Sequence, residues 1–413
     1  MLFFKECKKI IFSIVFLIYC AVMILFYFTQ FHNDCSGPID KPHQDNMINY
    51  NPYGSIIKED PEIVMPNAIE GLINEYLRGN FKAYPFGFYK SVRLKEKQKN
   101  QVAEIIFELS GITPEELNSF EDYAEGGYLV DENGQVTYQE AKTLEFDIPE
   151  NLSYERFREL MREVDKIIGG GSDYCDEFIL GNFSLVPKTY EDALAEYEEF
   201  MQEDNLIKGY TRLYCDYMGI FLSILPIFVV VSFLNQDKKS RMQDLIYSRP
   251  ISSVKLIFTR YFALVICLLL PIILTTFLAN ARVSNIYPDK NLNHFVMYQY
   301  MLGWLLPNIM IVSAIGMLIT NYSGLLAIFA QGAWWFHSAL ATGNLTGSIG
   351  KFTLVMRHNS LMEQDVFYAQ WNNIVFNRIF FTVLAVLIIL LTVLIYELKR
   401  KGVINGFQPN FKK

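Results

Sequence analysis

The residue types that most often carry catalysis or hold metals are scattered along this chain. It has five histidines and six cysteines, and no two histidines stand at the HExxH spacing that holds zinc on one face of a helix. His32, Asp34, Cys35 and His43 are close in sequence, but their irregular spacing favours a solvated stalk over a metal site. No G-x-S-x-G nucleophile elbow occurs. We therefore expect no catalytic residue, metal or cofactor on this chain, and no enzymatic activity.

Two glycine-containing segments share some features with phosphate-binding loops, and each lacks an essential part. The run Gly169–Ser172 is followed by no Lys-Ser or Lys-Thr pair, and it is more typical of a helix end and a turn. In Gly350–Thr353, Phe352 stands where a nucleotide loop requires Ser or Thr. The chain has no Walker motif, so any ATP-driven activity would need ATP bound to a partner chain.

A loop over residues 237–255 carries the most informative pattern of polar side chains. Met242, Leu245 and Ile246 fall on one helical face and charged side chains flank them, which predicts a short amphipathic helix at the membrane surface. Pro250 ends this helix, because its ring clashes with the preceding turn. The simpler alternative is an ordinary basic loop on the cytoplasmic side of a membrane.

The elements that position this loop follow from where charge is missing. Only 19% of the residues are charged, against about 25% in an average globular domain. Runs without Asp, Glu, Lys or Arg cover residues 10–33, 217–236, 261–281, 291–350 and 379–396. A spanning helix needs roughly 20 apolar residues, so the longest run accommodates two helices and a turn. We expect six spans: Ile10–Phe28, Tyr217–Asn235, Leu256–Leu278, Tyr300–Thr320, Leu325–Thr342 and Ile379–Tyr396.

Lysine and arginine indicate the orientation of these spans. Basic side chains gather in the N-terminal tail, in the 237–255 loop and in the C-terminal tail. An even number of spans puts all three on one side, and the positive-inside rule makes that side the cytoplasm. We expect a multi-pass protein of the cell membrane with both termini inside. Its residue usage, rich in Phe, Tyr, Ile, Asn and Lys, is typical of a Gram-positive bacterium with AT-rich DNA.

A large acidic segment separates the first two spans. Residues 31–211 hold 36 acidic and 16 basic side chains, a net charge of −20, which leaves +12 for the rest of the chain. This acidity argues against a nucleic-acid partner. Apolar periodicity predicts helices over residues 66–78, 93–110 and 153–168, and Asn133-Gly134 predicts a hairpin.

The expected fold class is therefore mainly α, a polytopic membrane protein with six transmembrane helices and an α-rich α+β extracellular domain. Its parts are residues 1–30, a cytoplasmic tail and the first span; residues 31–211, the extracellular acidic domain; and residues 212–413, a region of five transmembrane helices. Cys35 and Cys175 both fall in the extracellular part, where oxidising conditions favour disulfides. Spacing alone leaves open whether these two cysteines pair.

The order of these parts resembles the membrane-spanning permease subunit of ABC exporters of the second type. In that family a charged, Leu-rich cytoplasmic helix after the second span ends in Ser/Thr, a basic residue and Pro-Ile-Ser, as residues 248–252 do here. The resemblance covers the spans and this loop, and the large external domain departs from it. It implies that the loop docks on a separate cytoplasmic ATPase through Arg241, Asp244, Leu245, Ile246, Ser248, Arg249, Pro250 and Ile251.

The resemblance also implies a second permease copy, or a homologous permease, beside this chain in the lipid membrane. The expected function is export of a peptide, drug-like or amphiphilic substrate, energised by the partner ATPase. The aromatic and amide side chains Trp304, Gln331, Trp334 and Trp335 suit such cargo, although interfacial belts contain the same residue types. The main alternative is a membrane-anchored extracellular sensor or receptor that signals through a partner protein. The short cytoplasmic segments favour the permease, because a receptor would normally carry an output domain.

Overall fold

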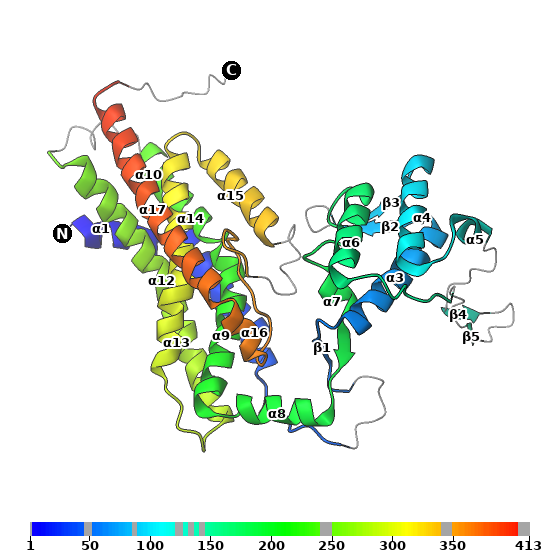
Figure 1. Cartoon of the computed structure of the whole chain (residues 1–413). Coiled ribbons are helices and arrows are strands. Elements are labelled where there is room, and N and C mark those ends of the chain that lie inside the picture. The colour runs from blue at the N-terminus through cyan, green and yellow to red at the C-terminus, as the bar shows by residue number, and fades with distance from the viewer. Residues whose placement is uncertain are drawn as a thin grey trace. The chain divides into compact units, whose positions relative to one another are not determined.

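The chain folds into a mainly helical structure with a few short strands (Figure 1). The computed structural model describes residues 2–44, 52–84, 89–119, 127–130, 136–139, 145–239, 250–339 and 349–403. These divide into two compact units, one formed by Met1–Lys41 with Leu194–Lys413 and the other by Pro42–Ala193. Each unit has a hydrophobic core of its own. The second unit lies inside the 31–211 range expected for the inserted domain.

The first unit, called the membrane unit below, is built almost entirely from helices. Its elements are α1 (Leu2–Ile11), α2 (Ile14–Tyr27), the π-helical turn η1 (Phe28–His32), α9 (Glu203–Leu222), α10 (Pro226–Lys239), α12 (Ser253–Ile286), α13 (Phe295–Tyr300), the π-helical turn η3 (Met301–Leu305), α14 (Leu306–Thr320), α15 (Gly324–Ala339), α16 (Gln364–Ala369) and α17 (Trp371–Arg400). Helix α8 (Tyr190–Phe200) crosses the boundary between the two units.

Four of the described helical segments are long and apolar enough to span a membrane: Ile14–His32, Ser253–Ile286, Phe295–Thr320 and Trp371–Arg400. A fifth span exists if α9 and α10 are taken together, and these two helices are bent by 40° at their junction. Helix α15 has 16 described residues, fewer than the roughly 20 that a span needs. The described residues thus account for four to five of the six expected spans, and the sixth stays a prediction.

The first expected span differs from the structure at its start. We expected Ile10–Phe28, but α1 ends at Ile11 and a new helix begins at Ile14. Ser13 separates them, because its Oγ accepts the backbone N–H of Phe16 at 3.1 Å and caps α2. Average hydropathy does not register a cap inside an apolar run, so the break was missed.

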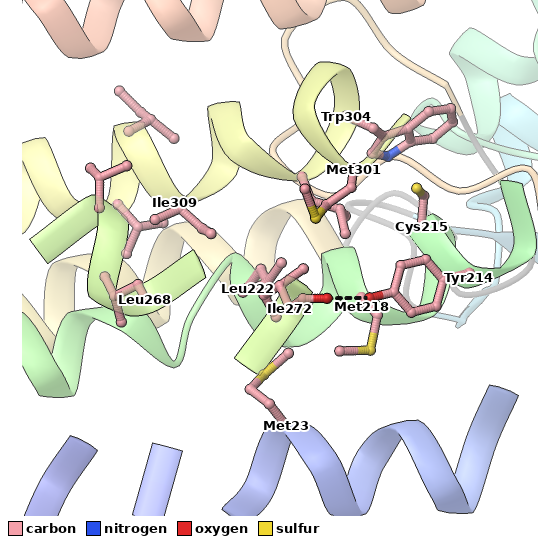
Figure 2. Close-up of a cluster of buried hydrophobic side chains, with 14 of the residues drawn as sticks. Met23, Tyr214, Cys215, Met218, Leu222, Leu268, Ile272, Met301, Trp304 and Ile309 are labelled. Atoms are coloured by element: carbon pink, nitrogen blue, oxygen red, sulfur yellow. Dashed lines mark hydrogen bonds between the residues drawn. The ribbon is translucent and has the colours of Figure 1, made fainter. Parts of the chain in front are cut away.

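Helix α14 lies at the centre of the membrane unit and packs against α10, α12, α15 and α17. The core around it is dominated by Leu, Ile, Met and aromatic side chains. Figure 2 shows part of this core, where side chains of α2, α9, α12, η3 and α14 interdigitate. Polar contacts also cross this core; in the one drawn, the Tyr214 hydroxyl donates to the carbonyl oxygen of Ile272 at 3.2 Å.

The second unit is a small α+β domain. Its helices are α3 (Pro61–Arg78), α4 (Glu96–Ser110), α5 (Pro114–Ser119), α6 (Tyr154–Ile168) and α7 (Ile179–Phe183). Three antiparallel pairs accompany them: β1 (Ser55–Ile57) with β6 (Leu185–Pro187), β2 (Phe81–Ala83) with β3 (Lys90–Val92), and β4 (Gly127–Val130) with β5 (Val136–Gln139). Apolar faces of α3, α4 and α6 form its core.

The helix ends expected in this unit at Arg78, Ser110 and Ile168 are confirmed, but two starts differ. Helix α3 begins at Pro61, after the Asp60 cap, and not at residue 66, and α4 begins at Glu96 and not at residue 93. Helix α6 begins after Ser153, whose Oγ accepts the N–H of Arg156, and it ends at Gly169 with φ of 119°. Glycines 170 and 171 also have positive φ, 88° and 72°, so the glycine run is a helix end and a turn. Strands β4 and β5 pair where the hairpin was expected, although the turn residues 131–135 lie outside the described part.

Candidate functional site

Most of the residues expected to contact an ATPase lie outside the described part of the chain. This applies to Arg241, Asp244, Leu245, Ile246, Ser248 and Arg249. Of the others, Pro250 is exposed and Ile251 is half-buried. Ser252 then caps α12, because its Oγ accepts the N–H of Lys255 at 3.2 Å. The chain therefore enters its next long helix directly after Pro-Ile-Ser, as the sequence predicts.

A cluster of four charged side chains holds the two helices that flank this loop. Asp237 near the end of α10 pairs with Arg260 of α12. Arg260 Nε also lies 3.8 Å from Glu6 Oε1 of α1, and Lys9 Nζ of α1 lies 3.4 Å from Glu6 and 3.6 Å from Asp237. We call these four residues the ion cluster. It joins α1, α10 and α12 at the point where the loop leaves and re-enters the helical body.

Burial makes the ion cluster more than a surface feature. Glu6 is 3% exposed and Arg260 is 7% exposed. A buried charge that loses its partner is costly, so the cluster favours one arrangement of the three helices. Two acids draw Arg260 into the helix packing, so its guanidinium does not extend to the surface of the helices. Glu6, the single acid among the first 33 residues, was the available signal.

The other end of the loop is tied to the last helix. The guanidinium Nη1 of Arg400 donates to the carbonyl oxygen of Ile251 at 2.7 Å. The Ser253 hydroxyl donates to the carboxylate of Glu397, one turn earlier in α17. The helix ends on either side of residues 240–249 are therefore fixed: the end of α10 is bound to α1, and the start of α12 is bound to α17. Displacement of the loop would act on these helices directly.

The junction of α9 and α10 is a second unusual feature. Three residues, Ser223, Ile224 and Leu225, separate α9 from α10 in the middle of an otherwise apolar stretch. Their freed backbone carbonyls need partners, since lipid offers none. Gln331 Nε2 of α15 donates to the Ser223 carbonyl at 2.7 Å, and Trp335 Nε1 donates to the Ile220 carbonyl at 2.9 Å.

Helix α14 completes this arrangement through one asparagine. Asn308 Nδ2 donates to Ser223 Oγ at 2.9 Å, and Asn308 Oδ1 accepts from Arg378 Nη1 of α17 at 2.6 Å. Arg378 Nη1 also donates to the Trp304 carbonyl at 2.8 Å. Side chains of α14, α15 and α17 thus converge on the break in α9–α10. Gln331 and Trp335, considered above as cargo-binding side chains, satisfy backbone groups here.

Residues 358–362, between α15 and α16, form hydrogen bonds with two buried charged side chains of α9, Asp216 and Arg212. Asp216 Oδ2 accepts the backbone N–H of His358 at 3.0 Å and that of Asn359 at 2.8 Å. Arg212 Nη2 donates to the carbonyls of Leu361 and Met362 at 2.9 and 3.2 Å. Burial lowers the pKa of His358 in this segment. These contacts explain why α9 extends well before Tyr217, where the charge-free run begins.

Cys35 and Cys175, the two cysteines expected outside the membrane, are free thiols in the structure and belong to different compact units. Cys35 is buried in the membrane unit, and Cys175 is half-buried in the other, where burial raises its thiol pKa. The pairing of Cys35 with Cys175 stays a prediction. Among the described residues, no group of three or more His, Cys, Asp or Glu side chains is placed to hold a metal ion.

No protein-family model, no curated protein and no solved structure matches this chain. The resemblance to a permease family therefore depends on the loop motif and on the order of the spans.

Proposed function

We propose that this chain is the membrane-spanning permease subunit of an ATP-binding-cassette transporter, energised by a separate cytoplasmic ATPase. The observation that carries the proposal is the ion cluster of Glu6, Lys9, Asp237 and Arg260. It ties both flanking helices of loop 240–249 to a third helix. A loop anchored in this way suits the transfer of mechanical work from a partner to the membrane helices.

The break between α9 and α10 supplies a place where such work could act. Helix α10 runs from Pro226 to the loop, so force on the loop reaches the three non-helical residues at 223–225. Polar side chains around a broken helix are typical of transport pathways in membranes. Rotation of α10 about this break would alter the hydrogen bonds of Asn308 and Gln331 with Ser223 and rearrange the helix packing around them.

The remaining parts of the proposal follow the resemblance. The chain would cross the cell membrane six times with both termini in the cytoplasm, and Pro42–Ala193 would lie outside. A second permease copy or a homologous permease would complete the path for a peptide, drug-like or amphiphilic substrate. ATP would bind and be hydrolysed on the ATPase subunits only.

Substitutions in the loop test the proposal. Leu245→Asp and Arg249→Glu should uncouple ATP hydrolysis from movement of the spans, because a charge enters the apolar docking face or reverses sign there. In proteoliposomes, we expect that neither variant stimulates ATP turnover by the partner ATPase. Protease protection should show that the membrane insertion of both variants is unchanged. Val403→Asp, at an exposed position outside the motif, is the control. Wild-type stimulation in both loop variants would contradict the proposal.

A further inference from the structure

A cavity of about 580 Å³ lies between η3–α14 on one side and α17 on the other. Its volume is in the range of about 300–1,000 Å³ that is usual for small-molecule sites. The lining is mainly apolar and aromatic, with Trp304, Pro307, Trp371, Ile374 and Val383 among its residues. The lining residues of α17 run from Trp371 to Val383, twelve positions, which corresponds to roughly 18 Å along a helix. The cavity is elongated and its lining is mainly apolar, which suits a hydrocarbon chain.

A single charged side chain, Arg378, stands among these lining residues. It is 6% exposed, and its Nη1 donates hydrogen bonds to two neutral acceptors, the Trp304 carbonyl oxygen and Asn308 Oδ1. Its Nε and Nη2 are buried without a hydrogen-bond partner. No ion pair among the described residues includes Arg378. Arg378, one of the residues that line the cavity, therefore carries a buried positive charge with two unused donors.

The two unused donors lie on one edge of the planar guanidinium. The Nε–H and Nη2–H bonds on that edge are parallel, and their spacing matches the two oxygens of a carboxylate or a phosphate. An uncompensated buried charge is strongly unfavourable, and an anion held by both donors would remove that cost. The chemistry of the site thus calls for a ligand with an anionic group and an apolar remainder.

Exposure on α17 indicates from which side this ligand arrives. Ile379 and Val383, which line the cavity, are 59% and 51% exposed on the surface of a helix that is apolar enough to span a membrane. The cavity therefore opens toward the surface that lipid would cover. Arg378 directly precedes the charge-free run 379–396, which places it at one end of the apolar part of α17. A headgroup at the level of Arg378 and a chain that extends past Ile379 and Val383 along the apolar part of α17 fit the position of a bilayer lipid.

We propose that this cavity binds an acyl lipid whose anionic headgroup is held by Nε and Nη2 of Arg378. The site uses neither loop 240–249 nor the ion cluster, so it does not depend on the proposed function. Water-soluble anions are poorer ligands, because they have no apolar part to cover the apolar lining of the cavity. Uncharged acyl lipids would leave the guanidinium donors unused.

Tryptophan quenching by a brominated fatty acid tests this directly, since Trp304 and Trp371 line the cavity. The probes are dibromostearate at alkaline pH and its uncharged methyl ester, added to the purified full chain in detergent. We expect saturable quenching by the carboxylate and binding of the ester weaker by about ten-fold or more, because the ester forms no charge-assisted hydrogen bonds. Equal binding of acid and ester to the wild-type protein would overturn the proposal.

Variants locate the site. Arg378→Gln should lower carboxylate binding to the level of the ester, whereas Arg378→Lys, which keeps the charge, should retain part of the preference. Arg282→Gln is the matched control, because Arg282 binds the Cys35 and Ser36 carbonyls away from this cavity. Trp371→Phe should reduce the quenching amplitude and Trp335→Phe should not. An unchanged amplitude in Trp371→Phe would overturn the location.

Inorganic phosphate separates a lipid from a soluble anion as the ligand. We expect phosphate not to displace dibromostearate, because it gains nothing from the apolar walls. Displacement by phosphate alone would show a soluble-anion site and contradict the lipid assignment. The ester comparison needs no variant, so the proposal stays testable even if Arg378→Gln does not fold.

Discussion

Arg260 illustrates how a charge can organise helices at the scale of single residues. It lies at the centre of the ion cluster, with Asp237 on α10 and Glu6 on α1 as its partners. The sequence shows Arg260 next to an apolar run, which identifies the start of a span but not its partners. Both partners lie far away along the chain, and the pairing depends on how three helices pack. Residue patterns alone do not contain that information.

Removing this arginine should loosen α1. Arg260→Gln leaves buried Glu6 and partly buried Asp237 with Lys9 as the remaining cation of the cluster, and breaking a buried ion pair typically costs about 3–5 kcal/mol. We expect Cys7, a half-buried residue on α1, to react several-fold faster with a maleimide in the variant. Lys255→Gln, at an exposed position on α12, should react like wild type. An unchanged rate in Arg260→Gln would show that the cluster does not hold α1.

Glu75 gives a prediction about pH in the second unit. Burial raises the pKa of Glu75 to about 7, against a hydrogen bond from the Tyr174 hydroxyl at 3.0 Å and one from the Lys82 N–H at 3.3 Å. Between about pH 4.3 and the folded pKa, the native unit keeps a proton that the unfolded chain has released. The free energy of unfolding should therefore fall as pH rises through that window and level off above it.

The substitution Glu75→Gln should remove this part of the pH dependence. Asp173, whose pKa is also raised by burial, and Asp176, whose pKa is lowered by Arg158, contribute slopes of their own. The informative quantity is thus the difference between the variant and wild type in thermal melts of residues 42–193. Glu70→Gln, exposed on the same helix, should keep the wild-type profile. Parallel profiles for wild type and Glu75→Gln would exclude a raised pKa.

At the scale of elements, close packing of α10 and α14 depends on a glycine. A Cβ at Gly316 would lie 2.8 Å from Ile227 Cδ1 and 2.9 Å from Val230 Cγ1, closer than real contacts allow. Small residues permit such approach between membrane helices. The helix that carries the break is therefore held tightly against the central helix of the unit.

A larger side chain at this position should separate the two helices. Gly316→Leu is expected to lower the melting temperature of the detergent-purified chain by several degrees, because overpacking typically costs about 1–3 kcal/mol. Gly332→Leu on α15, where a Cβ would meet open space, is the matched control and should melt close to wild type. Equal melting temperatures for the two variants would show that the α10–α14 contact adapts freely.

Charge-free runs predicted the long helices well and their internal breaks poorly. The spans expected at Leu256–Leu278 and Ile379–Tyr396 lie inside α12 and α17, since a long apolar stretch has few alternatives to a helix. The break at 223–225 and the cap at Ser13 were not anticipated. Both lie within apolar runs, and they depend on side chains of distant helices or on a single hydroxyl.

The same distinction applies to the candidate site. The loop and its Pro-Ile-Ser ending were recognisable in the sequence, because proline and a capping serine act locally. The ion cluster, the Asn308 contacts and the cavity at Arg378 were not, because each is assembled from helices far apart in the chain. Local rules find where an element ends, whereas partners across a membrane bundle require the packed structure.

At the scale of the whole molecule, the uneven charge matches the division into two units. The acidic insertion corresponds to a unit with its own core, and the basic remainder corresponds to the membrane unit. This organisation suits a permease that carries an extra external domain. It would also suit a receptor, so the decisive difference is the partner on the cytoplasmic side.

Recovery of that partner tests the central claim most directly. The full chain with an affinity tag is purified from its native membranes in mild detergent, and the proteins recovered with it are identified by mass spectrometry. The permease account predicts an ATPase with a Walker motif in stoichiometric amount, lost when Arg249→Glu is purified in the same way. Recovery of the wild-type chain without such an ATPase, or with a signalling protein instead, would contradict the account.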